Sequence, residues 1–158
     1  MAIRVRVASP DDVDDIRKLT RLLVAEVNQT FEEKRFEWGI QRRLYDPLQK
    51  HGILVAVDEE RENQIVGVIF AELRVDPWGS SEGYVKNFVV DPAYRGRGIG
   101  KELLSSSIEH LRAINVERVL INLNEDEPAA EKAGELYQRF GFKKKYSVLE
   151  LNLSKEGT

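Results

Sequence analysis

The amino-acid sequence predicts a mixed α/β (α+β) fold, in which a central, mixed and twisted sheet of roughly six to seven strands is flanked by about four helices. Short runs rich in β-branched and aromatic residues alternate with stretches whose apolar residues recur at helical spacing. Three glycines within residues 95–100 join one β-rich run to a helical stretch. A helix between two strands makes a parallel crossover the natural connection, so the sheet is expected to be mixed.

The first third of the chain predicts one strand and two helices. Residues 3–7 alternate apolar residues with arginines, which is typical of a strand with one buried face. Residues 9–12, Ser-Pro-Asp-Asp, indicate a helix start, because serine can cap, proline fits the first turn and acids favour the positive end of the helix dipole. This helix continues to residue 27, and a second helical stretch with a weaker apolar stripe covers residues 31–44.

The middle of the chain predicts a hairpin and the central strand. Residues 52–57 and 64–75 are β-rich runs joined by the charged turn 58–63. Residues 84–90 form the central strand, which Asp-Pro at 91–92 ends because proline lacks the N–H for the next ladder bond.

The last third predicts a helix, a strand, a second helix and a closing element. The first of these helices opens within or just after the glycines and runs to about residue 111. Residues 118–123 are the next strand, residues 128–141 the final helix, and residues 142–153 a closing strand or hairpin. At this length we expect residues 1–158 to form a single domain.

The functional centre of the sequence is the turn at residues 95–100, Arg-Gly-Arg-Gly-Ile-Gly. Free N–H groups in a first helical turn bind phosphate, and glycine lets a ligand approach the backbone. A dinucleotide fingerprint would need glycine in place of Lys101, and an NTPase loop would need glycine in place of Arg95 and Ser or Thr in place of Glu102. A turn without a ligand is the structural alternative, although glycines at a helix start lower helix propensity by roughly 1 kcal/mol each relative to alanine.

The pattern that does fit is Arg/Gln-x-x-Gly-x-Gly, formed by Arg95, Gly98 and Gly100. It resembles the acyl-CoA-binding turn of the GNAT superfamily of N-acetyltransferases, as does the stretch 87–96, Asn-Phe-Val-Val-Asp-Pro-Ala-Tyr-Arg-Gly. The resemblance covers nearly the whole chain and implies the GNAT fold, with acetyl-CoA as co-substrate. It implies that turn amides hold the pyrophosphate, that the preceding strand hydrogen-bonds the pantetheine arm, and that an N–H of Val89 or Val90 polarises the thioester carbonyl. The residues expected to bind the cofactor are Phe88, Val89, Val90, Arg95, Gly96, Arg97, Gly98, Ile99, Gly100, Lys101 and Asn124.

A second resemblance lies in residues 133–142, which are similar to the family's Ala-x-x-Leu-Tyr-x-x-x-Gly-Phe segment. It implies that Tyr137 is the general acid for the departing CoA thiolate, since a phenol with a pKa of ~10 is protonated at neutral pH and can donate to a thiolate. Two alternatives stay open: the tyrosine only packs at the helix end, or it binds the sulfur without acting as an acid. The family often has an asparagine where this chain has Ala130, and Asn122 and Asn124 are the candidates to replace it.

The sequence does not identify a general base. Histone-acetylating members of the family have a glutamate where this chain has Tyr84, which leaves Glu82 or Glu72 as weak candidates beside a water chain. The acceptor stays open among a small polyamine, an amino acid, an aminoglycoside, a peptide N-terminus and a protein lysine. The acids that would favour a cationic acceptor are Glu32, Glu33, Glu37, Glu72 and Glu82.

Composition argues against several function classes. The absence of cysteine removes thiolate metal sites, and His51 and His110 lack ligand-like spacing, so no metal is expected. A net charge of −3 gives no reason to expect nucleic acid or an anionic membrane as a partner. The chain has neither an apolar run of the ~20 residues that span a membrane nor a signal-like start, so we expect a cytoplasmic location. GNAT proteins are often dimers, which leaves a homodimer open.

These observations predict an N-acetyltransferase that moves an acetyl group from acetyl-CoA directly to a small-molecule or peptide amine in a ternary complex. Without cysteine and without a visible Ser-His pair, the chain offers no obvious nucleophile for an acyl-enzyme. Two other classes stay open: a GNAT-fold domain that binds acyl-CoA as a sensor without catalysis, and a nucleotide-binding α/β module, which the glycine spacing disfavours.

Overall fold

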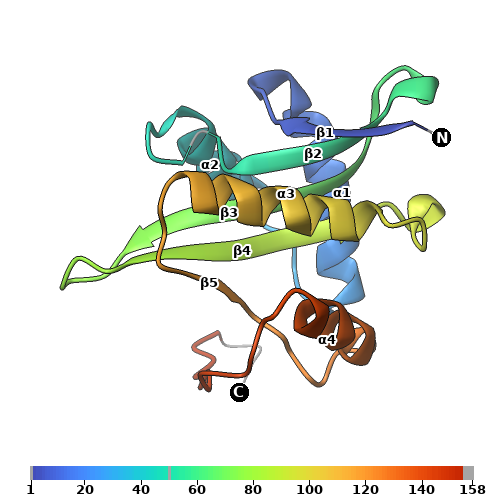
Figure 1. Ribbon diagram of the computed structural model, residues 1–158. Helices are drawn as coiled ribbons and strands as arrows, with labels where there is room; N and C mark the ends of the chain where they lie inside the picture. The colour runs from blue at the N-terminus through green and yellow to red at the C-terminus, as the bar shows by residue number, and fades with distance from the viewer. Residues whose placement is uncertain (1, 50, 155–158) are drawn as a thin grey trace. The chain divides into compact units, whose positions relative to one another are not determined.

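The chain divides into two compact units, residues 1–122 and 123–158, of which the computed structural model describes residues 2–49 and 51–154 (Figure 1). The first unit holds a five-stranded sheet and three α-helices, and the second holds one α-helix. The strands are β1 (Ile3–Val7), β2 (Ile53–Asp58), β3 (Gln64–Val75), β4 (Ser81–Val90) and β5 (Arg118–Ile121). The α-helices are α1 (Val13–Glu26), α2 (Glu33–Tyr45), α3 (Ile99–Ala113) and α4 (Ala130–Arg139).

The strands follow one another across the sheet in chain order. Neighbours from β1 to β4 pair antiparallel, whereas β4 and β5 pair parallel. Helix α3 connects this parallel pair, so the crossover expected from the sequence is confirmed and the sheet is mixed.

Helices cover the sheet of the first unit on both faces. Val55 and Val57 of β2 belong to one core cluster with Ile16 of α1 and Ile40 of α2. Figure 1 shows α3 across the other face, where its Leu111 is fully buried. Because β2 is covered on both faces, all six of its residues are buried: the first five are apolar, and the sixth is Asp58.

The first helix begins as the sequence indicates, but α1 itself starts later. Residues 10–12 form a 3-10 turn, and α1 follows from Val13. The backbone N–H of Ser9 donates to the Asp12 carboxylate over 2.8 Å, and Arg6 of β1 donates to the same carboxylate over 2.7 and 2.9 Å. Asp12 therefore ties the first strand to the start of the helix.

The predicted fold class is confirmed except for the number of strands, which is five in the described residues and not roughly six to seven. The closing strand or hairpin expected at residues 142–153 is irregular and exposed, with Tyr146 at 64% and Leu149 at 95%. Alternating apolar residues favour a strand, but a strand also needs a neighbour for its backbone N–H and C=O groups. This segment has no ladder partner among the described residues.

Across the described ranges, no helix is long and apolar enough to span a bilayer. Within the same ranges, no group of three or more histidines, aspartates or glutamates has the geometry to hold a metal ion.

Candidate functional site: a glycine turn, an open strand edge and a cation-lined cavity

The glycine turn is anchored to the sheet at its start. Beyond the end of β4, the Asp91 carboxylate accepts the N–H of Ala93 over 2.9 Å, and residues 92–94 form a 3-10 turn. The hydroxyl of Tyr94 donates to Asp58, a buried residue at the end of β2, over 2.8 Å. This hydrogen bond raises the pKa of the Tyr94 phenol, which therefore remains a donor. The turn is thus fixed to the strand two positions away in the sheet.

The glycines then place the start of α3 in the open. Gly96 and Gly98 have φ values of +79° and +81°, a left-handed conformation that glycine adopts without a steric penalty. Gly98 is the N-cap of α3, and no side chain caps this end of the helix. The N–H groups of Ile99, Gly100 and Lys101 consequently have no intrahelical acceptor and carry the positive end of the helix dipole. Backbone geometry alone therefore makes this end of the helix suited to an anion.

The cationic side chains of the turn are arranged around it. Arg95 donates to the carbonyl oxygen of Val90 over 3.0 Å and to Glu26 of α1 over 2.7 Å. The Arg97 guanidinium lies 5.2 Å from the ring centroid of Tyr94, and Lys101 is exposed on the first turn of α3. Arg95 therefore braces the turn from the side of α1.

Strand β4 carries a bulge just before the turn. Val68 of β3 pairs with Val89, but Phe70 pairs with Lys86, so Asn87 and Phe88 together oppose one residue. Asn87 has a φ of +50°, which asparagine tolerates better than most residues. Its side-chain N–H donates to the Thr20 hydroxyl of α1 over 2.9 Å. Bulges of this kind redirect side chains and are common beside active sites.

The other edge of β4 is open where the bulge begins. The parallel ladder with β5 covers only Glu82 to Val85, whereas β4 continues to Val90. Residues 86–90 therefore have no strand partner on that side among the described residues. An extended ligand can hydrogen-bond to such an edge as an added strand does. The open edge leads directly to the glycine turn.

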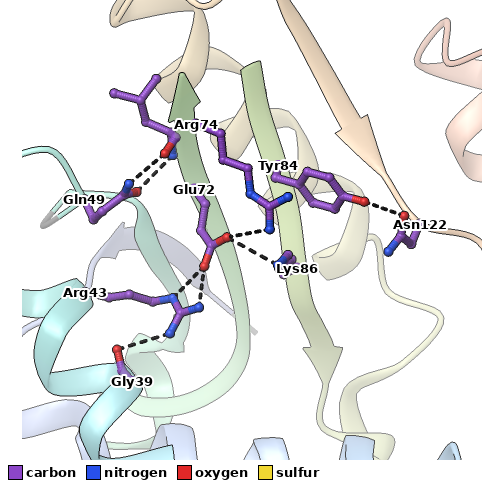
Figure 2. Close-up of polar contacts among 9 residues, drawn as sticks. Gly39, Arg43, Gln49, Glu72, Arg74, Tyr84, Lys86 and Asn122 are labelled. Carbon is purple, nitrogen blue, oxygen red and sulfur yellow. Dashed lines mark hydrogen bonds and ion pairs between the residues drawn. The ribbon is translucent and has the colours of Figure 1, made fainter. Parts of the chain in front are cut away.

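Glu72 of β3 is the centre of a charge cluster on the same sheet (Figure 2). Arg43 of α2 donates to it through Nε over 2.8 Å and through Nη2, while Lys86 and Arg74 approach to 3.4 and 3.5 Å. Burial alone would raise the pKa of Glu72, but the hydrogen bonds from Arg43 and the charge of Lys86 outweigh it and lower the pKa. Glu72 is thus a carboxylate held ionised by three cations.

Three of the other expected acids are also paired. Glu82 accepts from Arg118 over 3.2 Å, and it lies five residues before the bulge, about 17 Å along the strand. Glu33 and Glu37 of α2 pair with Arg17 of α1. Glu32 is exposed. The hydroxyl of Tyr84 donates to Asn122 over 2.6 Å, as Figure 2 shows.

A cavity of about 260 Å³ opens beside the bulge in the first unit. The sequence singled out none of its lining residues individually, because they come from four elements and share no motif. Phe36 and Arg43 do fall in the helical stretch 31–44, a region that the family resemblance implies lines the acceptor site. The signal that could have indicated it is Asn87, a poor strand former within a β-rich run. The lining residues are Thr20, Phe36, Arg43, Phe70, Lys86 and Asn87.

Tyr137 and Asn124 lie in the second unit, whereas the turn, the bulge and the cavity lie in the first. Tyr137 is on the last turn of α4, and its ring packs edge-on against Phe142 at 6.0 Å between centroids. Burial and the nearby charge of Glu127 raise its pKa. The Asn124 side chain accepts the N–H of Asp126 over 3.0 Å, and Ala130 begins α4.

The protein thus has a mixed α/β fold in which the open edge of β4 leads to a glycine turn and an uncapped helix. This arrangement suits an extended ligand that carries an anionic group. The family model for the acetyltransferase (GNAT) family matches residues 16–142. The chain belongs to this family.

Individual relatives agree with the family match. The chain is 35% identical over 101 residues to mycothiol acetyltransferase of Propionibacterium freudenreichii, which covers 64% of this chain but only 30% of that protein. It is 29% identical over 115 residues to glucosamine 6-phosphate N-acetyltransferase of Trypanosoma brucei, covering 70% of this chain and 73% of the relative. A predicted acetyltransferase of Clostridium acetobutylicum, solved with acetyl-CoA, shares the fold with a TM-score of 0.76 at 21% identity, covering 96% of this chain and 97% of that one.

Proposed function

We propose that the protein transfers an acetyl group from acetyl-CoA directly to a primary amine, with residues 1–158 acting as one GNAT domain. The observation that carries the proposal is that the open edge of β4 is followed along the chain by the uncapped start of α3. The edge offers backbone groups to the pantetheine arm, and the turn offers N–H groups to the pyrophosphate. The family match, which extends across both compact units, supports a single functional domain.

In the proposed reaction, the acceptor nitrogen attacks the acetyl carbonyl carbon while the N–H of Val89 or Val90 stabilises the developing oxyanion. The carbon–sulfur bond then breaks, and Tyr137 donates its proton to the CoA sulfur. The raised pKa of Tyr137 suits this role, because the phenol is protonated at neutral pH. The ammonium proton leaves before or during the attack, and no acyl-enzyme forms.

For the general base we propose water, in preference to either glutamate. Glu72 has a lowered pKa and is already bonded to Arg43, so it is a weak proton acceptor. Glu82 lies five residues before the bulge and is paired with Arg118. A water chain leading to the open β4 edge needs neither carboxylate.

A small-molecule amine is the acceptor class that we propose. The names of the relatives include glucosamine 6-phosphate N-acetyltransferase, mycothiol acetyltransferase and, from Bacillus subtilis, spermine/spermidine N(1)-acetyltransferase. Each name describes that relative only. The three molecules in these names differ widely in charge and size, so the choice of an acceptor class for this chain depends on its own residues.

The proposal is tested by a thermal-shift titration with acetyl-CoA, CoA, ATP and NAD, followed by an amine screen that measures free thiol. A ligand that binds only the folded state raises the melting temperature by mass action. We expect a rise with the two CoA species alone, and thiol release that depends on an added amine. Binding without thiol release for any amine would identify an acyl-CoA sensor, and a shift with ATP or NAD alone would contradict the site.

A further inference from the structure

The cavity beside the bulge has an unusual set of charges for the acceptor site of an amine. Its six lining residues include two cations, Arg43 and Lys86, and no acid. The carboxylate that these two cations share, Glu72, is only 14% exposed and is not part of the lining. Because Arg74 approaches Glu72 as well, three cations face one carboxylate, which leaves an excess of positive charge.

The cations of the cavity are held in place but keep donors for a ligand. The hydrogen bonds of Arg43 to Glu72 and to the Gly39 carbonyl use three of its five N–H groups. Lys86 makes one ion pair with Glu72 at 3.4 Å and has three N–H donors. Figure 2 shows both side chains converging on Glu72 from α2 and β4. A cation fixed by an ion pair loses less side-chain entropy when it binds a ligand.

Two further pairs of residues complete the site. Thr20 and Asn87 are hydrogen-bonded to one another over 2.9 Å and bring polar groups to the cavity. Phe36 and Phe70 supply apolar surface. Nearby Arg17, which lies 5.5 Å from the Phe36 ring centroid, pairs with Asp14, Glu33 and Glu37, and Glu33 also pairs with Arg21, so three carboxylates face two arginines there. The positive charge at the cavity therefore comes from the Glu72 cluster, in which three cations face one carboxylate.

The position of the cavity connects it with the reaction. Lys86 and Asn87 immediately precede Phe88, Val89 and Val90 on β4, where the open edge begins. A molecule in the cavity would lie next to the segment proposed to hold the thioester. This step depends on the proposed function, because only that proposal places the thioester on β4.

We propose that this cavity selects an acceptor that carries an anionic group, a phosphate or a carboxylate, in addition to its amine. Arg43 and Lys86 bind the anionic group, and Glu72 is a positioning residue that holds both cations. Charge-assisted hydrogen bonds from Lys and Arg to phosphate or carboxylate are the strongest of their kind in proteins. A polyamine, in contrast, would be repelled by the same two cations.

The test is isothermal titration calorimetry with two matched pairs of amines, measured with and without CoA. Glucosamine 6-phosphate is compared with glucosamine, and phenylalanine with phenylalaninamide; spermidine is the cationic comparison. We expect the member of at least one pair that carries the anionic group to bind about tenfold more tightly than its partner without that group, and this preference to weaken as salt is added. The phosphate pair and the carboxylate pair show which anion is recognised. Equal binding within both pairs, no binding by any member, or tightest binding by spermidine would overturn the inference.

Two variants separate ligand binding from folding. Lys86→Gln should remove most of the preference for the anionic group, while the partner amine without that group binds as before. Arg74→Gln is the matched control, because it removes a positive charge from the same carboxylate but from outside the cavity lining. We expect that control to change the preference by less than about twofold. An equal loss in both variants, or an equal loss for amines with and without the anionic group, would contradict a binding role for Lys86.

The two proposals fail in different ways. Loss of the acetyl-CoA thermal shift contradicts the proposed function, whereas binding in the absence of CoA still decides whether the cavity prefers an anion. If acetyl-CoA binds and amines with and without an anionic group are acetylated equally, the proposed function stands, but the proposal of an anionic acceptor is rejected.

Discussion

As proposed, the glycine turn and the cavity beside the bulge recognise ligands in opposite ways. The turn uses backbone N–H groups at the start of α3, which depend on two left-handed glycines and on the absence of a cap. The cavity uses side chains from α1, α2, β3 and β4, held by a network around one carboxylate. A backbone site within a short segment can serve every member of a family, whereas a side-chain site assembled from distant segments can change its specificity one residue at a time.

The largest effect in this comparison is expected for Gly98→Glu. A glutamate there places bulk and negative charge over the free N–H groups of α3 and should weaken acetyl-CoA binding at least about a hundredfold, the equivalent of losing two charge-assisted hydrogen bonds. Isothermal titration calorimetry measures the change directly.

The matched control is Gly79→Glu in the loop between β3 and β4. Gly79 has a φ of +90° against +81° for Gly98, and an added Cβ meets no atom within 4 Å at either position. The two substitutions should therefore destabilise the fold similarly. Equal acetyl-CoA affinity in the two variants would show that the turn does not bind the cofactor.

The contrast between the two sites also explains how much of them the sequence could predict. The turn is one continuous segment whose glycine spacing excludes dinucleotide and NTPase loops, so residues 95–101 are identifiable from the sequence alone. The crossover through α3 followed from the same segment. Arg43, Lys86 and Thr20 have no such signature, because arginine, lysine and threonine occur on any protein surface.

The errors of the sequence-based prediction have the same origin. Alternating apolar residues at 142–153 predicted a closing strand, but pairing depends on a neighbour that sequence periodicity does not reveal. The acids expected to attract a cationic acceptor, Glu33, Glu37 and Glu72 among them, are bonded to arginines from other elements. The cavity lining carries two cations and no acid, so its charge is opposite in sign to the net charge of the chain.

Tyr137 differs from the side chains of the cavity, because it lies in a local sequence motif and was therefore predicted as a site residue. If it is the general acid, Tyr137→Phe should lower kcat by about a hundredfold and leave the Kd for acetyl-CoA within about twofold. Burial raises the pKa of Tyr137 above the usual 10.0, so the phenol stays protonated at neutral pH. The kcat of the wild type should therefore fall only above pH 10.0. The variant should lack this alkaline decrease. Unchanged kcat in steady-state assays would leave Tyr137 with a packing role against Phe142.

The next prediction concerns stability: removing the charge of Glu72 should destabilise the fold, because this carboxylate holds the ion-pair network beside the cavity. Glu72→Gln leaves three cations without their shared carboxylate and should lower the free energy of unfolding at pH 7 by about 1–3 kcal/mol, measured with urea. Because the folded pKa of Glu72 is lowered, its contribution is fully present above the ordinary glutamate value of 4.5 and is lost as pH falls through the folded pKa. The difference between wild type and variant should therefore shrink below pH 4.5.

The exposed pair of Glu109 and Arg112 on α3 provides the control for that measurement. Their side chains are 68% and 71% exposed, so solvent screens the pair. Glu109→Gln should change the free energy of unfolding by less than about 0.5 kcal/mol at any pH. If Glu109→Gln lost as much free energy of unfolding as Glu72→Gln, burial of the Glu72 network would contribute no additional stability.

The smallest expected effect is on acetyl-CoA affinity, and it concerns Tyr94, whose side chain supports the glycine turn. The Tyr94 hydroxyl donates to buried Asp58 at the end of β2, so Tyr94→Phe removes the tie between this strand and the turn. The free N–H groups of α3 remain, but the turn that presents them is less fixed, and we expect acetyl-CoA to bind about threefold more weakly. Tyr45→Phe is the control, because Tyr45 is 64% exposed at the end of α2. Amine affinity in the cavity should be equal in both variants, since the Tyr94 hydroxyl bonds to Asp58, which is outside the cavity lining. A parallel loss of amine affinity in Tyr94→Phe would show that the two sites are coupled through the sheet and are not independent.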